Sequence, residues 1–144
     1  MLLPAAPASV AIARRQLSEE LRAAGVHDPA VADATLVISE LLSNAIRHAR
    51  PLDGSWLRLA WSLAAGSIEI EVSDGGSPTR PRQAHASRSS LGGRGIGIIQ
   101  HLARAWGVRS DDGMLTVWAI MPAPVGGRAR EPASPIGRLS AYPQ

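Results

Sequence analysis

The sequence contains no cysteine and no lysine, and each absence excludes classes of function. Without cysteine there is no disulfide, no thiol nucleophile and no zinc–thiolate site. Without lysine there is no Walker A loop, because that loop ends in a lysine that reaches the nucleotide phosphates. The phosphate-binding lysine of eukaryotic-type protein kinases is missing as well, and a lysine Schiff base cannot form. All fifteen basic side chains are arginine.

The chain also lacks a long apolar run and a clustered positive charge. No apolar stretch approaches the roughly 20 residues of a membrane span, and the first residues lack the charge of a signal peptide. The formal net charge is +3, but the arginines are scattered along the sequence. This scatter favours a solvated surface over a nucleic-acid interface. We therefore expect a cytoplasmic protein without direct contact to nucleic acid or membrane, and its 144 residues fit one domain.

Hydrophobic periodicity divides most of the chain into helices and strands. The expected elements are helices over residues 9–24, 29–49 and 95–105, and strands over 56–63, 67–73, 106–109 and 114–121. This order predicts an α+β fold, a two-layer α/β sandwich with helices on one face of a mostly antiparallel sheet. We expect the domain to span residues 8–121. A flexible N-terminus (1–7) would precede it, and a disordered tail (122–144), dispensable for folding, would follow.

Glu40, Asn44 and His48 follow one another at i, i+4 and i+8 on one face of the second expected helix. The asparagine offers a neutral oxygen that suits Mg²⁺ beside phosphate oxygens. The glutamate offers a base for a hydroxyl or water near the same phosphates. Taken alone, such a stripe is more typical of a helix face exposed to solvent.

Two further clusters contain glycine. Asp74 follows a strand and precedes Gly75 and Gly76, so its carboxylate could accept a hydrogen bond from an exocyclic amine such as adenine N6. Taken alone, this is more typical of an ordinary Asp-Gly turn. Residues 92–97 read Gly-Gly-Arg-Gly-Ile-Gly and lead into a helix, where backbone N–H groups bind phosphate well. A Rossmann fingerprint is rejected, because a polar loop precedes the glycines and an antiparallel hairpin follows them.

In this order, the three clusters resemble the N, G1 and G2 boxes of the Bergerat-fold ATPase superfamily, which includes gyrase B, Hsp90, sensor histidine kinases and MutL. The run of residues 40–48 matches the pattern Glu-x-x-x-Asn-Ala-x-x-His of the bacterial anti-sigma-factor kinases of the RsbW and SpoIIAB type. The resemblance covers about residues 8–121 and implies that the chain binds ATP and Mg²⁺ and acts as a serine/threonine protein kinase.

The resemblance also implies a role for each matching residue. Glu40 would be the general base, and Asn44 would hold Mg²⁺. Asp74 would bind adenine, with Gly76 beside it and Thr116 supporting the base through water. Residues 79–92 would form the ATP lid. The other implied nucleotide contacts are His48, Gly93, Arg94, Gly95, Ile96 and Gly97.

The family binds a sigma factor and phosphorylates a STAS-domain anti-anti-sigma factor, so both are the implied partners, and a homodimer is a further possibility. Three other interpretations stay open at this point. The chain could be a non-catalytic ATP-binding regulatory module, a detached histidine-kinase catalytic domain, or an arginine-driven nucleic-acid binder. Glu40 favours the enzyme over the module, because nucleotide binding alone does not need a base.

Overall fold

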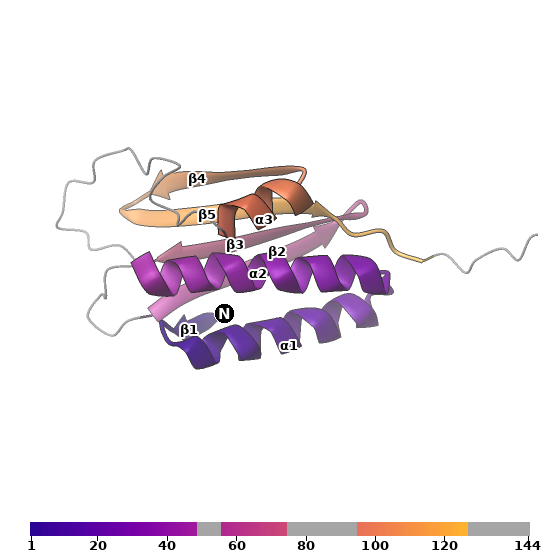
Figure 1. Ribbon diagram of the computed structural model, residues 1–144, viewed down its shortest axis with the longest axis horizontal. Helices are drawn as coiled ribbons and strands as arrows, with labels where there is room; N and C mark the ends of the chain where they lie inside the picture. Colours follow the sequence, from indigo (N-terminus) through magenta and orange to yellow (C-terminus); the bar gives the residue numbers. More distant parts are fainter. Residues whose placement is uncertain (49–55, 75–94, 127–144) are drawn as a thin grey trace, which may run out of the picture.

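A computed structural model describes residues 1–48, 56–74 and 95–126. Three helices lie on one face of a five-stranded sheet, which confirms the α+β two-layer prediction (Figure 1). The elements are β1 (Leu2–Pro4), α1 (Pro7–Ala23), α2 (Asp28–His48), β2 (Trp56–Ala64), β3 (Ser67–Asp74), α3 (Gly95–Leu102), β4 (Ala105–Asp111) and β5 (Met114–Pro122). The third helix stops earlier than its pattern predicted, because β4 already begins at Ala105.

The sheet has the strand order β1-β2-β3-β5-β4, and each of these neighbouring pairs is antiparallel. Two-residue turns close its β2–β3 and β4–β5 hairpins. Ala65 and Gly66 form the first turn, Asp112 and Gly113 the second, and all four residues have positive φ. Such turns match the right-handed twist of the flanking strands. Both turns fall between strands that the sequence predicted, over residues 56–63 and 67–73 and over residues 106–109 and 114–121.

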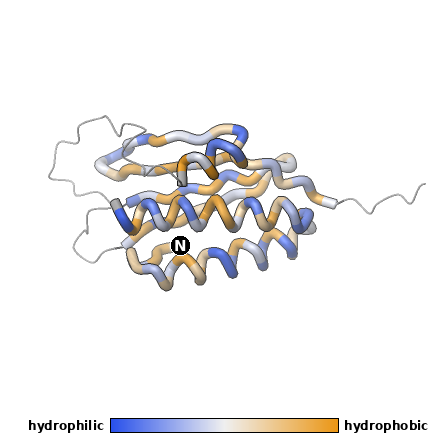
Figure 2. Tube along the Cα trace, in the orientation of Figure 1, coloured by the Kyte–Doolittle hydropathy of each residue, from blue (hydrophilic) through white to orange (hydrophobic). Residues whose placement is uncertain are grey.

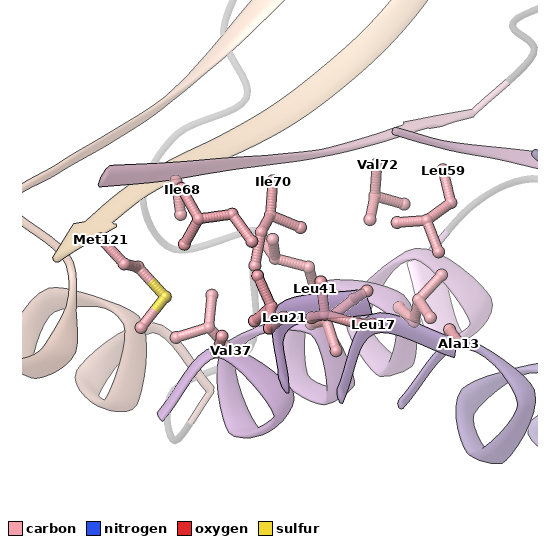
Figure 3. Packing of buried hydrophobic residues seen from close by; sticks show 14 of the residues in the cluster. Ala13, Leu17, Leu21, Val37, Leu41, Leu59, Ile68, Ile70, Val72 and Met121 are labelled. Atoms are coloured by element: carbon pink, nitrogen blue, oxygen red, sulfur yellow. The ribbon is translucent and has the colours of Figure 1, made fainter. Parts of the chain in front are cut away.

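The core lies between the helices and the inner face of the sheet (Figure 3). Bands of hydrophobic and hydrophilic residues alternate along α1 and α2, as the helical period requires (Figure 2). The sequence pattern predicts no apolar stretch as long as a membrane span, but α2 is apolar enough by length and composition to cross a membrane over Asp28–Arg47. Its residues Val37, Ile38 and Leu42 are nevertheless fully buried in the domain. The central position of α2 in this core therefore accounts for its hydropathy.

The first residues of the chain form a strand, so the predicted flexible N-terminus is wrong. Leu2–Pro4 pairs with β2 at the edge of the sheet, and Leu3 lies opposite Leu57. Leu3 is 7% exposed and belongs to the core. Proline is tolerated here because an edge strand has one side without ladder hydrogen bonds. Three residues are too few for a recognisable alternation, and this explains why the pattern missed the strand.

The domain also extends beyond its predicted end at residue 121. Ala123 is 1% exposed, and its N–H donates to the Gly66 carbonyl. Two more backbone hydrogen bonds join this segment to the α1–α2 connection, from the His27 N–H to the Pro124 carbonyl and from the Gly126 N–H to the Gly25 carbonyl. We call residues 122–126 the C-terminal clamp. The predicted disordered tail is therefore wrong for these residues, and its remainder, 127–144, lies outside the described residues.

The clamp gives a truncation prediction. A chain ending at Gly126 should keep the stability of the full chain, and a chain ending at Met121 should lose about 2–4 kcal/mol. The loss corresponds to three backbone hydrogen bonds at roughly 0.5–1.5 kcal/mol each, together with the burial of Ala123. Urea unfolding of the three chains measures this difference. Equal midpoints for the two truncated chains would contradict a structural role for the clamp.

Gly107 on β4 faces Trp118 on β5 across the sheet. A Cβ atom built at Gly107 would lie 2.8 Å from Trp118 Cζ2, which is closer than real Cβ contacts come. We expect Gly107→Ala to cost about 1–2 kcal/mol of unfolding free energy, because the indole ring of Trp118 must move away from position 107. In a Trp118→Leu background the same change should cost nothing, since alanine suits a strand better than glycine. Chemical denaturation of the four chains of this cycle measures the effect, and an equal cost in both backgrounds would contradict the steric explanation.

Candidate functional site

Glu40 and Asn44 lie one turn apart on α2, as their spacing predicted. Asn44 is only 5% exposed, and Glu40 is half-buried. Within residues 1–48, 56–74 and 95–126, neither side chain forms a hydrogen bond or an ion pair. A buried amide without a partner costs about 1–3 kcal/mol, so it indicates a group that is completed by something outside the chain. His48 is the last residue of α2, and its side chain lies outside the described residues.

Asp74 ends β3 and is half-buried. Its Oδ1 atom accepts a hydrogen bond of 3.2 Å from the backbone N–H of Leu115 on the neighbouring strand. This contact fixes the carboxyl group at the C-terminal end of β3. In Figure 1, β3 and α2 end on the same side of the molecule, and α2 also packs against β3. The structure therefore brings the first two sequence clusters to one end of the two layers.

Thr116 lies elsewhere than its predicted role requires. In the β3–β5 register it is opposite Ser73, and Asp74 is opposite Leu115. Successive strand residues point to opposite faces of a sheet, so the Thr116 and Asp74 side chains leave from different faces. The Thr116 hydroxyl forms a buried hydrogen bond of 2.7 Å with the Ser73 hydroxyl. Sequence reasoning missed Ser73, although the alternation of β3 already placed it on the face opposite Val72.

The glycine cluster is described only from Gly95 onward. Gly95, Ile96 and Gly97 form the first turn of α3, which packs against α2. Ile96 is 8% exposed, so its side chain contributes to packing. Gly97 is exposed, and a Cβ atom built there would meet no atom within 4 Å. The three other predicted glycine-cluster contacts lie outside the described residues, namely Gly76, Gly93 and Arg94, and so do lid residues 79–92.

A cation site made of protein ligands alone is not present in the described part of the chain. No group of three or more histidine, cysteine, aspartate or glutamate side chains is close enough there to hold a metal ion. The buried Asn44 amide would supply one oxygen ligand, and the half-buried Glu40 carboxylate lies one turn before it on α2. Mg²⁺ is commonly held by one or two protein oxygens together with substrate phosphates and water. The residues present therefore fit Mg²⁺ bound together with a nucleotide.

Comparisons with known proteins identify the family of this domain. The family model of the histidine kinase-like ATPase domain matches residues 3–121. The chain is 27% identical over 127 residues to the serine-protein kinase RsbW of three Listeria monocytogenes strains, and the match covers 80% of this chain and 81% of the relative. These relatives and the family model cover nearly all of the described domain.

A crystal structure containing the RsbU and RsbW domains of Rv1364c from Mycobacterium tuberculosis has the same fold, with a TM-score of 0.62. It is 22% identical in sequence, and the match covers 87% of this chain. The chain spans 33% of that longer protein. The family model covers most of the chain, and this chain therefore belongs to the histidine kinase-like ATPase domain family.

Proposed function

We propose that this protein is an ATP-dependent serine/threonine protein kinase of the anti-sigma-factor type, acting in the cytoplasm. The observation that carries the proposal is the pair on α2, a buried Asn44 amide and a half-buried Glu40 carboxylate, neither of them bonded within the described chain. A nucleotide-binding module needs the asparagine, and it has no use for a base one turn away. The RsbW relatives support the same reaction class.

In the proposed site, Asn44 would hold Mg²⁺, and the Asp74 carboxylate would accept a hydrogen bond from adenine. The backbone N–H groups at the start of α3 would bind phosphate oxygens. ATP supplies the γ-phosphoryl group when bound. The acceptor hydroxyl oxygen forms the new bond to phosphorus, ADP leaves, and Glu40 takes the hydroxyl proton. Catalysis of this kind rests mainly on positioning and electrostatics.

The resemblance to the family also gives the proposed partners. The acceptor would be a serine or threonine of a STAS-domain anti-anti-sigma factor, and a sigma factor would compete with it for the kinase. In this way the phosphorylation state of one partner would decide which partner is bound. Incubating the protein with γ-labelled ATP and each STAS-domain protein of the same genome tests the proposal. If the protein binds ATP but labels none of them, the non-catalytic regulatory module is the better interpretation.

The adenine assignment is tested separately by changing Asp74. Asp74→Asn keeps an oxygen for the Leu115 N–H, so this contact should be retained. It removes the charge from the proposed adenine contact, and ATP affinity should fall by about 1–3 kcal/mol. Calorimetry with ATP and GTP measures this, and Asp112→Asn in the β4–β5 turn is a matched control that should change nothing. Equal affinity of the wild type for ATP and GTP would refute the assignment.

A further inference from the structure

An open, apolar depression lies between α2 and α3. Its volume is about 440 Å³, and it is lined by Leu36, Gly97, Ile98, His101 and Leu102. Leu36 is 42% exposed, although α2 otherwise turns its large apolar side chains toward the core. A single exposed leucine is ordinary in a folded protein. Here it forms a wall of a depression that the other helix completes.

The glycine in this depression is not required by the packing of the described chain. Gly97 lies inside a helix, where glycine costs roughly 1 kcal/mol relative to alanine. A Cβ atom at this position would meet nothing within 4 Å. Its φ is not positive, so backbone conformation does not demand glycine either. The missing side chain leaves this part of the depression open, beside the backbone N–H groups proposed above to bind phosphate.

The depression lies next to the proposed base. Leu36 precedes Glu40 by four residues, so the two side chains are neighbours on one face of α2, roughly 5–6 Å apart at their Cβ atoms. A stable protein–protein contact covers about 800 Å² on each partner. A protein that presents a hydroxyl to Glu40 therefore has to cover Leu36 as well, since a contact of that size reaches well beyond one helical turn.

We propose that this depression is the docking site for an apolar side chain of the acceptor protein, on the segment that carries its phosphorylated hydroxyl. The side chain would be of leucine, methionine or phenylalanine size and would lie about one helical turn from the hydroxyl. Leu36 and Ile98 would contact it, and the depression would thereby select acceptors from among hydroxyl-bearing proteins. This inference rests on the kinase function proposed above.

The test uses the acceptor identified by the labelling experiment and three variants of the full chain. Leu36→Asp should raise the KM for the acceptor roughly 10- to 100-fold, as loss of a buried interface anchor does. The KM for ATP and the melting temperature should stay unchanged. Leu36→Met should retain wild-type behaviour, because methionine fills a similar volume. Ile12→Asp is the matched control, since Ile12 is similarly exposed on α1, away from the depression.

The outcomes separate this inference from the proposed function. If the wild type labels no acceptor, the kinase proposal fails and the docking site fails with it. If the wild type labels an acceptor and Leu36→Asp does so with unchanged KM, only the docking site is refuted. Two further results would assign the depression to an occupant other than the acceptor protein. A wild type that dimerises in gel filtration while Leu36→Asp is monomeric would assign the depression to a second copy. An effect of Leu36→Asp that vanishes in a chain ending at Gly126 would assign it to residues 127–144.

Discussion

Glu40→Gln should lower the rate of phosphoryl transfer by about 10²–10⁴-fold while ATP still binds with wild-type affinity. Glutamine keeps the size of the side chain and its ability to form hydrogen bonds, but it cannot take a proton. Glu40 has no ion pair or hydrogen bond within the described residues, so its replacement breaks no contact there and stability should be unchanged. Single-turnover transfer of label to the acceptor, beside calorimetry with Mg·ATP, measures both quantities.

A matched control is available on β3. Glu69→Gln removes a carboxylate of the same type from a half-buried position on the opposite face of the sheet, and it should transfer phosphate at the wild-type rate. If Glu40→Gln also transferred at that rate, Glu40 would not be the base. If Glu40→Gln instead lost ATP affinity, the carboxylate would act in nucleotide binding.

The second large effect concerns Asn44, where stability and function should change in opposite directions. Asn44→Leu replaces a buried, unbonded amide by an apolar group of similar shape, so the nucleotide-free protein should become more stable by up to about 1–3 kcal/mol. The same change removes the proposed Mg²⁺ ligand, and Mg²⁺-dependent ATP affinity should fall roughly 10- to 100-fold. Thermal unfolding without nucleotide and ATP titrations with and without Mg²⁺ measure the two effects.

Thr116→Val provides the contrast for this experiment. Thr116 is as buried as Asn44, but its hydroxyl is bonded to Ser73, so its loss leaves one buried hydroxyl without its partner. We expect this variant to be less stable by about 1–3 kcal/mol. A lower melting temperature for Asn44→Leu as well would show that the Asn44 amide is satisfied in the folded protein, against the role proposed for it.

Much of the fold could be predicted from local patterns. The two hairpins combine alternating strands with a glycine at the second turn position, and α1 and α2 have clear helical periods. The missed parts depend on distant partners. Leu2–Pro4 becomes a strand because it pairs with β2, where Leu3 lies opposite Leu57. The C-terminal clamp is held by hydrogen bonds to backbone atoms of Gly25, His27 and Gly66. These backbone hydrogen bonds do not depend on which side chains the residues carry, so the sequence pattern does not reveal them.

The candidate site was predictable to a different extent at each position. Glu40 and Asn44 stand on one helix, so their spacing of four residues was enough to place them together. Thr116 depends on the register between two strands, and a shift of one residue changes the face to which a side chain points. The family resemblance implied a contact of Thr116 with the base, and the observed pairing gives the Thr116 hydroxyl a partner in Ser73.

The C-terminal clamp joins the α1–α2 connection to the end of the domain across almost the whole described sequence, since Val26 forms a bridge with Val125. Contacts between residues so far apart in sequence slow folding, because a long loop must close before they are gained. During synthesis, the α1–α2 connection cannot form its hydrogen bonds with the C-terminal clamp until residues 122–126 have left the ribosome. The helix that carries Glu40 and Asn44 thus receives its final support last, and a nascent chain stalled before residue 122 would present these residues on an incompletely anchored helix.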